Sequence, residues 1–440
     1  MRHLLARLTI IFVLVCPALH AETFTEGFVT HIAPSGEFDV NGIHVVLSPK
    51  TSITVKQWDD SSDIHRLVSN SASTLPPLFL GQTVEVVGEV THKATEIRAK
   101  RITISPAPAS SVAGVGIIDL IPASSSSAEG RLLRADGYYM LIPTTLGATF
   151  AAPLKSSDDI HTNQWLRYHG VQRPDGIVVL DQADFSPNTI NHREDRLRVK
   201  TDYAPEEIDK GDAQSGTSKF FLGKDPTRLP AWHDEAMQAR VDRIGKSLIP
   251  AFQKALSEDD PTRIDFRFQV TDEPKHRDTW SMPSGIILIP YQVVERLPED
   301  AQLAAILADS IAEALEKQTL RDVPAHHKMT AARIAGDAAG VVIPGAGLVT
   351  MVANHEAGKS LTAQAQQQSG RVSLCLLHDA GYDIAKAPIA WWILASKPKD
   401  DLLATRMPDH TFFLFQELGT TWQTASEPAL PARPAAHPAS

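Results

Sequence analysis

The sequence has few cysteines and no block of one charge. Its two cysteines, Cys16 and Cys375, fall in an expected leader and in an apolar stretch, so no intrachain disulfide is expected in the mature chain. Lys and Arg number 42 against 52 Asp and Glu, giving a formal net charge of -10. Because no basic run is present, we expect no nucleic-acid binding. No apolar run is long enough for a spanning helix, so we expect no integral membrane segment once the leader is removed.

The chain also lacks the short motifs of several enzyme classes. There is no G-x-S-x-G, no phosphate-binding loop and no cysteine pair. Four histidines come nearest to a metal-site pattern, but none has H-x-x-x-H spacing on a helix: His326, His327, His355 and His378. A metal site rebuilt from these residues is therefore not expected.

The first 21 residues have the pattern of a secretory signal peptide. Arg2 and Arg7 form a basic region, and the apolar run LTIIFVLV follows at 8–15. Pro17 then precedes an expected cleavage site after Ala21. The pattern predicts a protein that is secreted or periplasmic.

From 22 to about 187 the sequence has short runs rich in Val, Ile and Thr, which are typical of β-strands. The pattern occurs twice. Residues 82–88 match 164–170, residues 102–106 match 183–187, and residues 27–49 match 130–153. We predict two tandem small β-barrels of OB-like character, at 22–107 and 112–187. A polar insertion is expected at 57–80 of the first.

The remaining chain is predicted to be a linker at 188–230, a mainly helical domain at 231–420 and a disordered Pro/Ala-rich tail at 421–440. Within the domain we expect helices at about 232–257, 300–318 and 363–379, with strands at 264–271 and 285–290. The apolar stretch 338–352, which Pro344 interrupts, is expected to be a buried helical turn.

The helix at 300–318 carries a core stripe, with Leu303, Leu307, Ile311 and Leu315 at every fourth position. Asp309, Glu313 and Glu316 fall on another face. This stretch resembles the active-site helix of the HtpX-like and CAAX-prenyl-protease family of gluzincin zinc metallopeptidases, which reads E-L-A-A-V-L-x-H-E-I-A-H. Laid on that helix without a gap, Asp309 stands at the first zinc histidine, Ser310 at the catalytic glutamate and Glu313 at the second histidine.

Two further blocks agree with that family in order and spacing. DTWSMPSGI at 278–286 is similar to the family's N-A-F-A-L-P-G-G-Y, and AGYD at 380–383 is similar to its A-G-Y-D-P-like turn. Counting back from this turn puts Gln366 at the third zinc ligand. The resemblance covers roughly 230–420 and implies an α+β multidomain protein with a gluzincin metallopeptidase-like domain after the two barrels.

The residues at the family's site positions do not carry its chemistry. Peptide hydrolysis there needs two neutral imidazoles, a carboxylate and a glutamate general base. Asp309, Glu313 and Gln366 offer only oxygen donors, and the hydroxyl of Ser310 is not ionised near neutral pH. We therefore expect no catalytic residue, no bound metal and no cofactor, with zinc only if the family activity is retained. Asp309 and Glu313 are expected to be solvated side chains lining an inactive cleft.

One property of the family does not require metal. The edge strand beside its active helix pairs with an extended peptide. The run 285–290 is predicted to hold that place, with Gly285, Ile286, Ile287, Leu288 and Ile289 as the peptide-binding edge. The expected function is that of an exported pseudopeptidase that binds an extended peptide or an envelope protein. An active metalloendopeptidase with substituted ligands and a purely structural envelope protein are the alternatives.

Overall fold

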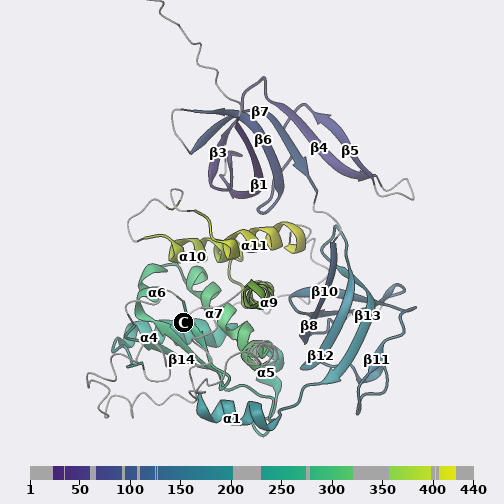
Figure 1. The fold of residues 1–440 in the computed structure, drawn as a ribbon, viewed down its shortest axis with the longest axis vertical. Coiled ribbons are helices and arrows are strands. Elements are labelled where there is room, and N and C mark those ends of the chain that lie inside the picture. The colour runs from purple at the N-terminus through teal and green to yellow at the C-terminus, as the bar shows by residue number, and fades with distance from the viewer. Residues whose placement is uncertain are drawn as a thin grey trace, which may run out of the picture.

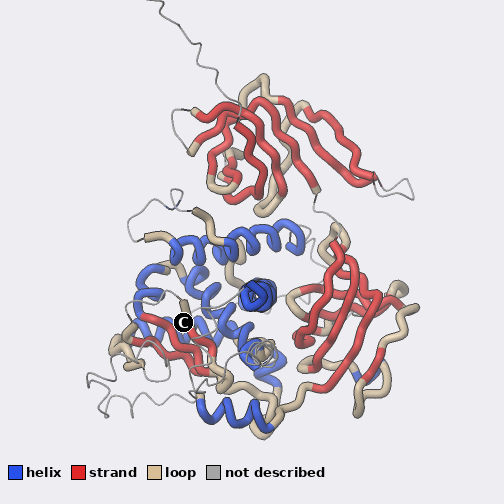
Figure 2. Tube along the Cα trace, viewed as in Figure 1, coloured by secondary structure: helices blue, strands red, loops and turns tan. Residues whose placement is uncertain are grey.

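A computed structural model describes residues 23–33, 35–59, 66–91, 95–106, 110–123, 125, 127–201, 229–273, 278–320, 356–397, 402 and 406–422. The signal peptide, the stretch 338–352, the tail from 423 and the histidines at 326, 327 and 355 lie outside these residues. The N-terminal half contains two closed five-stranded β-barrels and the C-terminal part is mainly helical, so the protein is α+β (Figures 1 and 2).

The strands are β1 Thr23–Ile32, β2 Phe38–Val40, β3 Ile43–Val46, β4 Ser52–Asp59, β5 Arg66–Ala72, β6 Thr83–Val90, β7 Glu96–Ser105, β8 Ser110–Leu120, β9 Gly130–Ala135, β10 Tyr138–Pro143, β11 Thr149–Phe150, β12 Gln164–Gln172, β13 Val178–Pro187, β14 Arg267–Thr271, β15 Trp280–Ser281 and β16 Ile286–Pro290. The helices are η1 Ser157–Asp159, α1 His192–Lys200, α4 Glu235–Leu248, α5 Ala251–Ala255, α6 Tyr291–Arg296, α7 Asp300–Leu315, α9 Glu356–Ala380, α10 Lys386–Ala395, α11 Asp409–Glu417 and η5 Leu418–Trp422.

The two barrels have the same strand order. The first is the ring β3-β2-β1-β6-β7, which a parallel β3–β7 pairing closes. The second is the ring β10-β9-β8-β12-β13, closed in the same way by parallel pairing of β10 with β13. Within the insertion expected at 57–80, β5 pairs antiparallel with β4 and so extends the first sheet.

The second half of the predicted repeat is confirmed in register. Thr83 pairs with Ser105 in the first barrel, as Trp165 pairs with Ser186 in the second. Both ladders shift at the corresponding glycine, which is Gly88 or Gly170. These shifts are β-bulges, which bend a strand so that a small sheet can close on itself.

The match of 27–49 with 130–153 is wrong. Gly27 pairs with Val84 and Gly116 pairs with Leu166, so the first strands that correspond are β1 and β8. The corresponding hairpin turns are at 41–42 and 136–137, where all four residues have positive φ. Asn-Gly and Asp-Gly are the sequences that such two-residue turns favour. The match of 27–49 with 130–153 instead places the turn at 35–36 opposite the turn at 136–137.

The strand at 285–290 is central and not an edge strand, so that prediction is also wrong. β16 lies between β14, which runs parallel to it, and β15, which runs antiparallel. All five residues of β16 are buried. A continuous apolar run is typical of a strand covered on both faces, and the described edge next to α7 is the two-residue β15.

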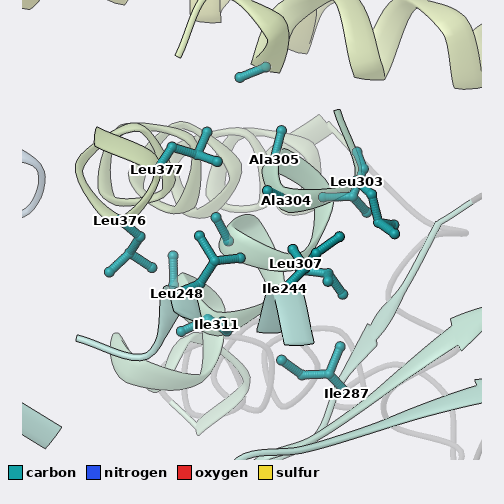
Figure 3. Close-up of a cluster of buried hydrophobic side chains, with 14 of the residues drawn as sticks. Ile244, Leu248, Ile287, Leu303, Ala304, Ala305, Leu307, Ile311, Leu376 and Leu377 are labelled. Carbon is teal, nitrogen blue, oxygen red and sulfur yellow. The ribbon is translucent and has the colours of Figure 1, made fainter. Parts of the chain in front are cut away.

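The helices pack around α7, which contacts α4, α9 and α10. Their core is apolar and includes Ile244 from α4, Ile287 from β16 and Leu377 from α9 (Figure 3). The helix expected at 232–257 ends at Leu248 and restarts at Ala251, because Pro250 cannot continue a helix. The segment 188–230 is not only a linker, because it contains the helix α1. Residues 202–228 lie outside the described residues.

Both barrels contact the helical part. The first lies over α11, where the rings of Phe28 and Phe412 are 4.7 Å apart (Figure 1). The second lies beside α9, and its buried Ile117 belongs to the helical core. Among the described helices, none has both the length and the apolar character of a membrane span.

Candidate functional site

The helix α7 places the first two site positions inside the protein. Most of its residues are buried, including Asp309 and Ser310. Ala304, Ala305, Ala308 and Ala312 lie on this helix, and such small side chains let neighbouring helices approach closely. The expectation that Asp309 is solvated is therefore wrong, since only 6% of it is exposed.

Asp309 faces an imidazole that the sequence pattern did not identify. Its Oδ1 lies 4.0 Å from Nε2 of His410 on α11. Both side chains are buried, and neither of these two atoms has a hydrogen-bond partner. The ring of His410 meets Trp391 edge-on at 4.7 Å, and it lies close to Gly370 of α9, where a Cβ atom would be only 3.0 Å from the ring.

Burial makes this pair neutral. It raises the pKa of Asp309 to about 8, an effect that the nearby charge of Asp278 increases and a hydrogen bond with Ser369 reduces. Burial also lowers the pKa of His410 to about 4. At pH 7 the stable forms are therefore a carboxylic acid and an uncharged imidazole, in contrast to a salt bridge.

Ser310 holds the edge strand against α7. Its hydroxyl oxygen lies 2.5 Å from that of Thr279 and donates to the carbonyl of Ile306. The Ser281 hydroxyl donates to the Ser310 carbonyl at 2.7 Å. These contacts give Ser310 a structural role.

Glu313 is half-buried and lines a cavity of only ≈ 10 Å³. The same cavity is bordered by Lys317, whose ammonium group contacts Glu194 of α1 at 3.0 Å. Arg198, also on α1, pairs with Glu194 at 2.9 Å. The helix α1 thus closes the space in front of Glu313, and about one water molecule fits there.

Gln366 is exposed on α9, and Ser369 is the α9 residue that contacts Asp309. His378 contacts Asp379 and the ring of Trp422. Cys375 is buried, and its pKa is raised by burial, which fits a core residue. Within the described ranges no group of three or more His, Cys, Asp or Glu could hold a metal ion. Asp309 and His410 alone do not fit a three-ligand zinc site.

The polar centre between the second barrel and the helices was also not predicted. Arg371 of α9 donates to Asp136 at 2.8 and 2.9 Å, and the Tyr168 hydroxyl donates to the same carboxylate at 2.5 Å. Gly114 and Gly116 of β8 leave the space that this carboxylate occupies. The sequence pattern indicates only the Asp-Gly turn at 136. The partners of the Asp136 carboxylate, Tyr168 and Arg371, lie far from it along the chain.

Comparison with protein-family models and with curated proteins finds no match to this chain.

Proposed function

We propose that this protein is an exported, non-catalytic peptide-binding protein whose helical domain is a metallopeptidase-like scaffold without zinc chemistry. The observation that carries the proposal is the use of Asp309 and Ser310 as packing residues. Asp309 is buried as a neutral acid beside a neutral His410, and Ser310 is bonded to Thr279. Neither residue can ionise a water molecule near neutral pH, which is what peptide hydrolysis of this class requires.

The proposal keeps the part of the family's behaviour that needs only backbone hydrogen bonds. An extended peptide can add to an open strand edge without being cleaved. The ring order of both barrels supports the OB-like interpretation, and OB-folds are binding modules that take oligonucleotides or oligosaccharides across their strands. These modules therefore support binding better than a purely structural role.

The test is metal analysis of the purified protein together with hydrolysis of casein, with and without a chelator. We expect less than stoichiometric zinc and no chelator-sensitive cleavage. Cleavage that chelator stops, and that Asp309→Ala abolishes while Gln366→Ala retains it, would falsify the non-catalytic proposal.

One observation favours a second candidate, a metalloenzyme with substituted ligands. Asp309 Oδ1 and His410 Nε2 are unpartnered and face each other. A carboxylate and an imidazole are both common ligands of transition metals. The same assay separates the two candidates, because here His410→Ala would remove both the metal and the activity.

A further inference from the structure

A groove of ≈ 520 Å³ separates β8 of the second barrel from α9. One wall is the first half of β8, including Ser111 and Ala113, and the other includes Gln364 and Gln367 of α9. These four residues are exposed. At the deep end lies the buried Asp136 with its ion-pair partner.

The first half of β8 has one strand edge that no described strand covers. Residues 110–117 pair with β12, whereas β9 pairs only with Ile118 and Leu120. The ladder between 110 and 117 is regular. Because backbone groups alternate sides along a strand, every second residue points its N–H and C=O away from β12.

Hydrogen bonds from helix side chains at the deep end of the groove show which residues of β8 point their backbone groups away from β12. The Ile117 N–H donates to the Glu316 carboxylate at 3.2 Å, and the Val115 carbonyl accepts from Gln368 at 2.8 Å. The backbone groups of residues 115 and 117 therefore point toward the helices. By alternation, the N–H and C=O groups of Ser111 and Ala113 point toward the groove. At 115–117, helix side chains form the hydrogen bonds that a partner strand would otherwise make. At 111–113, the groove leaves room for such a strand.

The chemistry of the walls indicates the ligand. The exposed lining residues Ser111, Ala113, Gln364 and Gln367 carry no charge. The charged residues of the floor, Asp136 and Arg371, neutralise each other. A charged side chain would lose its hydration here without gaining a partner, whereas side-chain amides can bond both N–H and C=O groups of a peptide.

We propose that this groove binds an extended peptide segment with uncharged side chains, which adds as a strand to the open edge of β8. The backbone of Ala113 bonds the peptide on one side, and the amides of Gln364 and Gln367 bond it on the other. The open edge from 110 to 114 has five residues, so at about 3.4 Å per residue on both strands it accommodates about five peptide residues. The proposal rests on the proposed function, because it places the peptide binding that this function requires.

The probe is a fluorescein-labelled set of short peptides composed of Ala, Ser, Thr, Val and Gln, titrated against the full chain by fluorescence anisotropy. A second set carries Asp or Lys, and a third carries N-methyl groups on alternate amides. We expect saturable binding of the uncharged set only. Methylation should weaken it by about tenfold or more, which corresponds to one hydrogen bond of about 1.4 kcal/mol.

Variants locate the site. The pair Gln364→Ala and Gln367→Ala should weaken binding by about tenfold, and Ala113→Pro should do the same because it removes an N–H that faces the groove. Gln366→Ala is the matched control, since Gln366 is exposed on the same helix but does not line the groove. It should bind like the parent protein. Circular dichroism shows whether each variant is folded.

The outcomes separate this inference from the function beneath it. Binding that resists both groove variants and N-methylation overturns the β8 site but leaves peptide binding in place. Binding seen only after removal of 423–440 means that the chain's own C-terminal segment is the occupant, and also overturns the proposal. Displacement of the bound peptide by a neutral chitin oligosaccharide would assign the groove to a glycan and also overturns the proposal. If no peptide set binds, the proposed function itself fails.

Discussion

At the scale of single residues, the buried pair of Asp309 and His410 makes stability depend on pH in opposite directions. Folding raises the pKa of Asp309 from its usual value near 3.8 to about 8, so the folded protein holds more protons between these pH values. The stability that Asp309 contributes is therefore lost as pH rises through that window. Folding lowers the pKa of His410 from 6.5 to about 4, so the unfolded chain holds more protons between these pH values. The folded state therefore gains stability as pH rises from about 4 to 6.5. The two contributions to stability largely cancel below pH 6.5. Above pH 6.5 only the loss of stability from Asp309 remains.

We therefore predict that the helical part loses about 2 kcal/mol of unfolding free energy between pH 6.5 and 8, at about 1.4 kcal/mol per pH unit. Asp309→Asn, which mimics the neutral acid, should remove this loss. In that variant the stability should instead rise with pH up to about 6.5, because His410 then acts alone. Urea unfolding followed by the helical circular dichroism signal measures both curves. Identical slopes in parent and variant would show that Asp309 does not titrate as described.

At the scale of secondary-structure elements, the sequence predicted α7 well and its surroundings poorly. The Leu303, Leu307, Ile311 and Leu315 stripe is buried, and the helix begins at residue 300 as expected. However, a stripe fixes only one face of a helix. Asp309 is covered by α9 and α11, which come from 356–417, so its burial depends on contacts that no local pattern contains.

The placement of the edge strand failed for a related reason. The length and apolar character of 286–290 were read correctly as a strand, but not its position in the sheet. A continuous apolar run such as IILIP is typical of a strand covered on both faces, and such a strand lies inside a sheet more often than at its edge. In contrast, the offset between 82–88 and 164–170 was sufficient to find corresponding barrel strands, because both ladders shift at a glycine, Gly88 or Gly170, where a Cβ atom would collide with a backbone carbonyl of the neighbouring strand.

The assignment of α7 to the family's active helix can be tested by restoring the missing groups. Asp309→His, Ser310→Glu, Glu313→His and Gln366→Glu together would supply two imidazoles, a general base and a third ligand. We predict that this variant gains about one zinc per chain, measured by elemental analysis after dialysis.

The matched control for the restored site is the triple variant that keeps Gln366. It should hold zinc more weakly, because one of the three protein ligands is missing. If the quadruple variant keeps its helical circular dichroism signal but stays free of metal, the alignment of α7 with that helix is wrong.

At the scale of the whole molecule, the two barrels depend on the helices to different degrees. The first touches α11 through Phe28 and through close backbone packing at Gly81. The second makes three polar contacts with α9 and the C-terminal end of α7: the Ile117 N–H with Glu316, Arg134 with Asp379, and Asp136 with Arg371. These contacts lead us to expect that, in a fragment of residues 22–187, only the first barrel keeps its full stability.

The joint between the second barrel and the helices is tested most directly at Arg371. Asp136 is 3% exposed at its side chain and depends on this guanidinium for charge compensation. Arg371→Met removes the partner and leaves a buried carboxylate, which should cost about 3–5 kcal/mol of unfolding free energy. The measurement is urea unfolding combined with hydrogen exchange, in which amides of β8 and β12 should lose protection before those of the first barrel.

Arg173→Met is the control for the same chemical change at the surface of the same barrel. The Arg173–Asp175 ion pair is exposed, with 40% of each side chain accessible, so its loss should cost less than about 1 kcal/mol. Equal effects of the two variants would mean that the Asp136 carboxylate is already hydrated in the folded protein. The groove beside β8 would then have no fixed floor against which a peptide could be aligned.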